Sequence, residues 1–172
     1  MAIFIAAEIM FFAGLISAFL VLRAQAPDWP PMDQPRLPVG VTGFNTALLI
    51  LSGWTMHLAA TTLRGSRTGV VRWLKITALL GGAFLAIQGY EWVRLINFGL
   101  TTSSSLYGGT FYTLVGAHGL HVLVALIALL WAIRLGVRNR LQAEPNIIEP
   151  FRMYWLFVVA VWPVLYVLVY LG

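Results

Sequence analysis

Two histidines in one long apolar stretch are the residues of this chain best suited to chemistry. His118 and His121 lie three residues apart within residues 110–122. On a helix this spacing brings both imidazoles to one face. Polar side chains in the hydrocarbon of a bilayer are costly and typically mark functional sites. The pair is therefore a candidate for binding a metal, carrying a proton or joining two helices.

Glu8, His57 and Glu91 are the other ionisable residues deep inside apolar stretches. With a rise of about 1.5 Å per residue, Glu8 and His57 fall at a similar depth, and we predict that they pair. By the same argument Glu91 pairs with His118 near the opposite membrane surface, while His121 lies near the midplane. Simpler alternatives stay open, because Glu8 can reach lipid head groups and His57 can bond a backbone carbonyl. Glu91, which follows Gln88, can equally belong to an interhelical hydrogen-bond group.

A metal or haem site on this chain is disfavoured by the small number of donors. The chain has three histidines and no cysteine, and a His-x-x-His pair needs further ligands at the same depth. A haem held by His57 and His118 would need both at one level, which the depth count does not provide. Gly116 and Gly119 beside the pair allow another backbone to approach closely. We predict a tight helix crossing with the imidazoles as hydrogen-bonding groups, and no bound metal.

The composition is that of an integral membrane protein. Of the 172 residues 60% are hydrophobic and 10% are charged, and the mean hydropathy is +0.85. A helix needs about 20 apolar residues to cross a bilayer, and the chain offers five such spans, at residues 2–22, 43–63, 73–96, 109–133 and 151–171. We predict a single all-α transmembrane domain. Residues 1–22 lack a basic lead and carry Glu8, so we interpret them as a helix rather than a cleaved signal peptide.

The basic residues predict the orientation. The net charge of +5 comes from residues in short links beside the spans, which argues against nucleic-acid binding. Two links are strongly basic, the second with Arg64, Arg67, Arg72 and Lys75 and the fourth with Arg134, Arg138, Arg140 and Arg152. By the positive-inside rule these links are cytoplasmic. The N-terminus is then inside, the C-terminus outside, and the proline-rich link around Trp29 external.

Taken in order, these residues resemble subunit III of the haem–copper respiratory oxidases. The matching segments are Glu8-Ile-Met-Phe-Phe-Ala-Gly14, Asn45-Thr46 with Leu51-Ser-Gly53, Gln88-x-x-Glu91, Tyr107-Gly108-x-Thr110-Phe111, Gly116-x-His118-Gly-Leu-His-Val122 and Tyr154-Trp155-x-Phe157-Val158 with Trp162. The resemblance covers nearly the whole chain and corresponds to the five-helix form of the family.

The resemblance implies an accessory subunit that is not an enzyme on its own. Such a subunit packs on catalytic subunit I beside subunit II, binds phospholipid, and supports proton uptake by a complex that reduces O₂ to water and pumps protons. Haem and copper would be on the partner subunits, in a bacterial inner membrane. By resemblance Glu8 is the buried carboxylate that reacts with hydrophobic carbodiimide. Gln88, Glu91, His118 and His121 would form an internal polar cluster.

The last span departs from the family pattern. Leu156 and Val159 stand where the family has His and Asp, and Pro163 stands where it has leucine. A proline cannot donate to the carbonyl four residues back, so we expect a kink and a freed Val159 carbonyl that could replace the lost acceptor. The first span begins almost at Met1, so the family's short cytoplasmic lead is either absent or lies before Met1.

Three other functions compete with the accessory oxidase subunit. The lost His and Asp keep open the related accessory subunit of a nitric oxide reductase. A small proton-coupled transporter would use Glu8 and Glu91 as carriers and would show broken helices at a midplane site. A free-standing metalloenzyme is opposed by the count of three histidines.

Overall fold

The computed structural model describes residues 1–31, 35–62, 67–138, 140–143 and 145–171. The long helices are α1 (Ala2–Gln25), α2 (Val39–Thr62), α3 (Arg67–Asn97), α4 (Leu106–Val137) and α6 (Ile148–Leu165). A π-helical segment, η2 (Tyr166–Leu171), continues α6, while a short helix α5 (Arg140–Ala143) and a 3₁₀ turn η1 (Pro145–Ile147) precede it. Five helices are long and apolar enough to cross a membrane, and the described residues contain no strand. The all-α prediction with five spans is confirmed.

The helices are longer than the predicted spans, most of all where basic residues begin or end them. α3 starts at Arg67 rather than residue 73, and α4 ends at Val137 rather than residue 133. A hydropathy count stops at charged side chains, whereas backbone hydrogen bonds continue past them. Residue 63 of the second predicted span, together with Arg64, lies outside the described residues.

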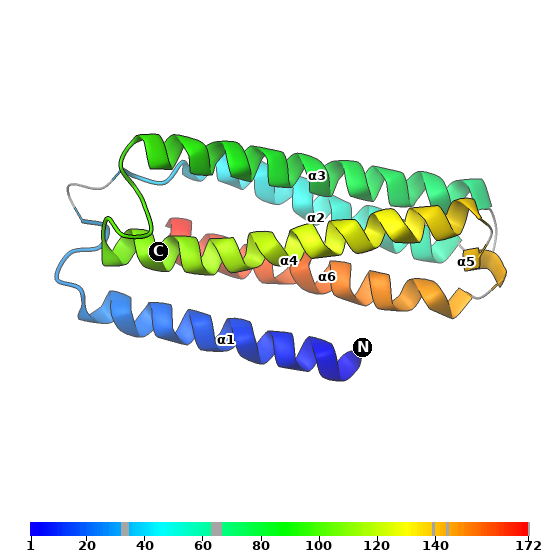
Figure 1. The fold of residues 1–172 in the computed structure, drawn as a ribbon, viewed down its shortest axis with the longest axis horizontal. Coiled ribbons are helices and arrows are strands. Elements are labelled where there is room, and N and C mark those ends of the chain that lie inside the picture. Colours follow the sequence, from blue (N-terminus) through cyan, green and yellow to red (C-terminus); the bar gives the residue numbers. More distant parts are fainter. Residues whose placement is uncertain (32–34, 63–66, 139, 144, 172) are drawn as a thin grey trace.

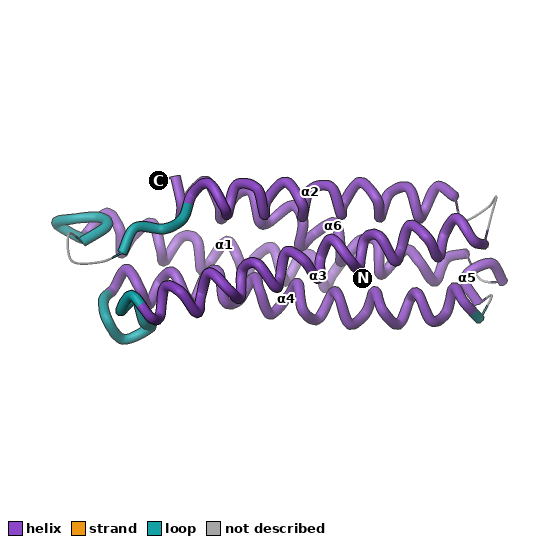
Figure 2. Tube along the Cα trace, turned by 90° about the horizontal axis from the view of Figure 1, so that it is seen from above, coloured by secondary structure: helices purple, strands orange, loops and turns teal. Residues whose placement is uncertain are grey.

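The long helices lie side by side in one elongated bundle (Figure 1). α1 is at its edge and packs on α4 and α6. Figure 2 shows that the described connecting residues 26–31, 35–38 and 98–105 gather at one end, called here the Trp29 end. The opposite end, which carries α5, is called here the Arg140 end. The N-terminus of α1 stops well short of the Arg140 end in both views.

Indole-to-hydroxyl hydrogen bonds join α6 to α2 in the interior. Trp162 Nε1 donates to Thr46 Oγ1 at 2.8 Å, and Trp155 Nε1 donates to Ser52 Oγ at 3.2 Å. Both indoles are buried. A buried indole N–H needs an acceptor, so these bonds fix how far α6 is rotated and shifted along α2.

The turn between α3 and α4 is shaped by two glycines. Gly99 has a φ of +90°, and the next residue, Leu100, donates its N–H to the Leu95 carbonyl at 2.9 Å, which closes the end of α3. Ser105 caps α4 by accepting from the Gly108 N–H at 3.0 Å. A Cβ on Gly108 would collide with the Thr101 carbonyl. This explains why glycine follows tyrosine in the segment Tyr107-Gly108.

Candidate functional site

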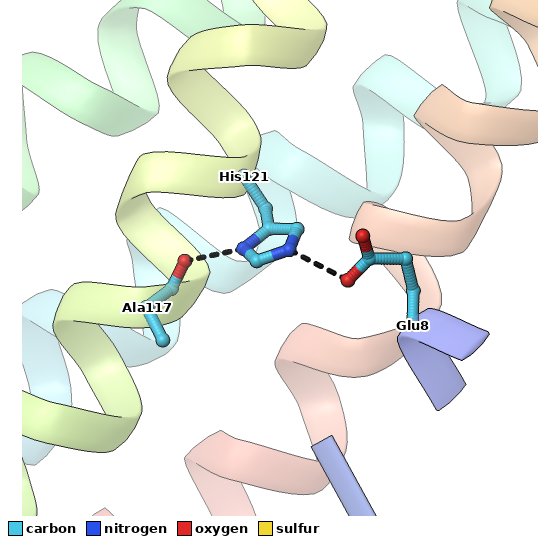
Figure 3. A network of polar contacts seen from close by, with 3 residues as sticks. All are labelled: Glu8, Ala117 and His121. Atoms are coloured by element: carbon cyan, nitrogen blue, oxygen red, sulfur yellow. Dashed lines mark hydrogen bonds and ion pairs between the residues drawn. The ribbon is translucent and has the colours of Figure 1, made fainter. Parts of the chain in front are cut away.

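Glu8 of α1 and His121 of α4 form the acid–base pair of this bundle (Figure 3). His121 Nε2 lies 2.8 Å from Glu8 Oε2, and His121 Nδ1 lies 2.7 Å from the Ala117 carbonyl oxygen. The carbonyl only accepts, so Nδ1 carries a hydrogen. An unprotonated Nε2 facing a carboxylate would place two acceptors together. A proton must therefore also lie between Nε2 and Oε2.

That proton allows two arrangements, either imidazolium with carboxylate or neutral imidazole with carboxylic acid. Both are electrically neutral as a pair, which lowers the cost of placing them in an apolar environment. The Glu8 and His121 side chains are 18% and 15% exposed. The Phe11 ring stacks on His121 at 5.8 Å and the Phe12 ring meets it edge-on at 5.0 Å. The geometry can hold one proton at the helix surface between α1 and α4.

The predicted pairing of Glu8 with His57 is wrong. His57 lies on the exposed face of α2, with its ring 6.3 Å from that of Trp54. The prediction measured the depth of both residues from the cytoplasmic ends of their predicted spans, as if those ends were level. The N-terminal part of α1 lies beside the middle of α4 (Figure 1), so Glu8 is level with His121.

The predicted pairing of Glu91 with His118 is also wrong. His118 is 0% exposed and stacks on Trp162 at 4.8 Å. The rings of Phe84 and Phe12 meet it edge-on, and neither of its nitrogens has a hydrogen-bond partner among the described residues. Three residues turn a helix by about 300°, so the two side chains point in directions about 60° apart. His118 is therefore turned toward α3 and α6, while His121 is turned toward α1.

Gln88 and Glu91 form a separate polar group near the Trp29 end. Thr42 Oγ1 of α2 lies 2.9 Å from Glu91 Oε2 and 3.0 Å from the Pro38 carbonyl oxygen, and its single hydrogen serves one of these acceptors at a time. Gln88 Nε2 donates to the Tyr170 hydroxyl of η2 at 3.2 Å. The predicted single cluster of Gln88, Glu91, His118 and His121 is thus divided, because these side chains face different neighbouring helices.

Two residues of this group were not predicted from the sequence. Thr42 and Tyr170 come from the start of α2 and the end of the last span, where a hydroxyl is common and carries no distinct signal. Their common level at the Trp29 end follows from the antiparallel order of the helices. To find them from the sequence, one would have to assign every polar residue its position along the bundle axis.

Gly116 and Gly119 lie at a contact between α3 and α4, although a side chain rather than a backbone uses the space. A Cβ on Gly119 would lie 3.4 Å from Cη2 of Trp92, and one on Gly116 would lie 3.8 Å from it. The glycines therefore make room for an indole. The predicted close backbone approach is not seen at these two glycines, because the neighbour within 4 Å of either Cβ position is this indole and not a backbone.

The departures in the last span create an apolar contact with α2. Val159 and Leu156 lie against Gly53, with Val159 Cγ1 3.1 Å from the place of a Cβ on that glycine. No side chain in the described ranges donates to the Val159 carbonyl, so a substitute acceptor there is not supported. Pro163 lies inside α6, and the π-helical segment η2 begins three residues later.

The donor set does not fit a haem or a copper ion. Both ring nitrogens of His121 are engaged in hydrogen bonds, and His118 is enclosed by aromatic rings. His57 is on a different helix face. Within the part of the chain that the structure describes, no three His, Asp or Glu side chains come together as a metal site.

The fold and the site define a multi-pass helical membrane protein with an acid–base pair between two of its helices. The family model described as cytochrome c oxidase subunit III matches residues 1–172. The chain belongs to this family, as the resemblance of its motifs predicts, and it is a subunit of a haem–copper oxidoreductase complex.

Individual relatives agree with the family match. Cytochrome c oxidase subunit 3 of Synechocystis sp. is 39% identical over 173 residues, which cover 98% of this chain and 72% of that protein. The probable subunit 3 of Nocardia farcinica is 39% identical over 171 residues, covering 98% and 84%. The probable subunit 3 of Mycobacterium leprae is 38% identical over 173 residues, again covering 98% and 84%.

Proposed function

We propose that this chain is a non-catalytic subunit that supports the catalytic subunit I of an O₂-reducing, proton-pumping oxidase, in a complex with subunit II. The observation that carries this proposal is the state of its three histidines, none of which is placed to ligate a redox metal. His121 is bonded through both nitrogens and His118 is packed between rings. Haem and copper then belong to the partner subunits.

The edge helix α1 is the surface proposed for contact with subunit I. It buries only Phe12 and Phe19 among its own residues. On its outward face Ile3 is 88% exposed and Met10 is 75% exposed. A helix that is apolar all round packs against lipid or another membrane subunit. Its place at the edge of the bundle leaves that face open to a partner (Figure 1).

The Glu8–His121 pair is the element proposed to support proton uptake. It holds one proton between Nε2 and Oε2, as argued above from its hydrogen bonds. A carbodiimide adds to the protonated form of a carboxyl group, and an apolar carbodiimide partitions into apolar surfaces. Glu8 is 18% exposed, and the carboxylic acid form is one of the two arrangements open to its pair with His121. This supports Glu8 as the carbodiimide-reactive carboxylate.

Lipid binding is proposed for a groove between α3 and α4 at the Arg140 end. The groove has a volume of about 530 Å³ and is lined by Arg72 and Lys75 beside the apolar side chains of Val71, Ile76 and Val137. Two cations above an apolar wall suit a phospholipid with an anionic head group. By the positive-inside rule the basic links support an orientation with this end on the cytoplasmic side of a bacterial inner membrane, the N-terminus inside and the C-terminus outside.

Purification in mild detergent with visible spectroscopy tests the proposal. We expect a large haem-bearing subunit to co-purify with this chain, and we expect no chromophore on this chain after the subunits are separated. Haem or iron retained by the isolated chain would overturn the assignment of the redox metals to the partners.

The competing functions receive less support. The relatives described above are named as oxidase subunits, not as nitric oxide reductase subunits. A transporter of the broken-helix kind would have an unwound segment near midplane. α1, α2, α3 and α4 run as continuous helices over their stated bounds.

A further inference from the structure

The Glu91 carboxylate is buried but only half satisfied by protein atoms. The residue is 3% exposed, and its Oε2 lies 2.9 Å from Thr42 Oγ1, whose single hydrogen also has the Pro38 carbonyl oxygen within reach at 3.0 Å. Its Oε1 has no hydrogen-bond partner in the described part of the chain, and the same holds for Gln88 Oε1. A buried carboxylate oxygen without a donor is costly. A donor from outside the protein is therefore expected at Glu91.

A small cavity beside Glu91 has the size and lining for that donor. It has a volume of about 70 Å³ and lies between Glu91, Arg94 and Leu95 of α3 and the segment Pro35–Pro38, with Arg36 in its wall. A water molecule occupies about 30 Å³ in the liquid, so the cavity has room for at least one water. Glu91, Arg36 and Arg94 are among its lining residues, and a carboxylate and guanidinium groups are polar partners of the kind that a buried water needs.

The charges around the cavity favour water over an ion. Arg36 and Arg94 repel a metal cation, and Glu91 repels an anion. The other elements packed here contribute Thr42 from α2 and Tyr170 from η2. Water is neutral and both donates and accepts hydrogen bonds, so it fits among these groups without adding an unpaired charge.

The cavity is also close to the aqueous phase. Arg36 is exposed and lines both this cavity and a second one of about 230 Å³, which reaches Trp29, Tyr107 and Tyr170. Both are at the Trp29 end, where the connections gather (Figure 2). Water at Glu91 therefore has only a short way to bulk solvent.

We propose that Glu91 is hydrated from the Trp29 end through water held under the Pro35–Pro38 segment, and that it exchanges protons with the aqueous phase through this water. A proton that reaches the bound water from the aqueous phase passes on to the carboxylate oxygen and returns by the same route, so that the water is neutral before and after each transfer, while Thr42 lies beside the other oxygen. Glu8 and Glu91 then lie in different surroundings. Glu8 faces the apolar surface at mid-length, whereas Glu91 faces water at one end.

Hydroxyl-radical footprinting of the intact complex tests the hydration. Radicals formed from bound water oxidise side chains that line it, even where these are buried. Leu95 lines the cavity and is 4% exposed, while Leu74 lies on the same helix at 0% and lines none of the cavities described here. We expect oxidation of Leu95 severalfold above that of Leu74. Equal protection of the two leucines would overturn the proposal without any substitution being needed.

Infrared difference spectroscopy on the complex tests the proton exchange. We expect a band that is lost in Glu91→Gln and kept in Glu8→Gln, and that converts between carboxylate and carboxylic acid when the bulk pH is stepped. Thr42→Val, which keeps the side-chain shape, should shift this band without removing it. A Glu91 band that stays constant across the pH steps would overturn the exchange, even if Leu95 proves to be hydrated.

Discussion

At the scale of single residues, the Glu8–His121 pair is defined by the proton that lies between its two side chains. The Ala117 carbonyl holds a hydrogen on His121 Nδ1, so the link between Nε2 and Glu8 must contain a second one. The pair is neutral in either arrangement and is tolerated beside the rings of Phe11 and Phe12. A carboxylate that looks isolated in the sequence is thus one half of a proton-holding unit.

Glu8→Gln should leave the subunit assembled and abolish its labelling by a hydrophobic carbodiimide. The glutamine amide can still donate to His121 Nε2, so the hydrogen bond and the neutral charge are kept while the acid is lost. Mass spectrometry of the labelled complex measures the effect. Glu149→Gln, at an exposed carboxylate paired with Arg152, is the control and should leave the labelling of Glu8 unchanged. Undiminished labelling of this chain in Glu8→Gln would refute the assignment.

The pairing itself is tested by double-mutant cycles on the free energy of unfolding. Alanine substitutions of Glu8 and His121 should couple by about 0.5–3 kcal/mol, the range for residues in contact. The same cycle with His57 in place of His121 should be additive, because His57 lies on another face of the bundle. Additivity in both cycles would mean that the Glu8–His121 bond contributes nothing to stability.

At the scale of the elements, the contact between the Trp155 ring of α6 and the backbone of α3 depends on one glycine. The six-membered ring of Trp155 lies where Gly81 would carry a Cβ, and the Trp155 indole is fixed by its bond to Ser52. The ring therefore cannot move away without loss of that bond. The contact ties three helices together at one level.

Gly81→Ala should destabilise the bundle by about 1–3 kcal/mol, the usual cost of overpacking a core. Gly82→Ala is a matched control, because nothing lies within 4 Å of the place of its Cβ. Unfolding in mixed detergent measures both variants. Equal stability of the two would show that the Trp155 ring yields easily.

At the scale of the whole molecule, the bundle has two chemically different ends and one open side. Arginine and lysine side chains gather at the Arg140 end, and the capped turn and the proline segment are at the Trp29 end. α1 lies at the edge with its apolar face outward (Figure 1). The ends predict the orientation in the membrane, and the side predicts where a partner subunit packs.

The orientation can be tested directly because the chain contains no cysteine. Ser103→Cys at the Trp29 end should react with an impermeant maleimide on intact cells. Arg138→Cys at the Arg140 end should react only after the cells are made permeable. Both side chains are exposed, so burial does not confound the comparison. The reverse pattern would invert the predicted topology.

The sequence by itself determined the fold class and the family. Long apolar runs admit only helices that satisfy their own backbone in lipid, and the motifs around Glu8, His118 and Trp155 carry the family resemblance. The tertiary structure decided which acid meets which imidazole. That choice depends on where each helix begins relative to its neighbours and how far it is rotated, and hydropathy records neither. Glu8 therefore meets His121 rather than His57, and Glu91 meets Thr42 rather than His118.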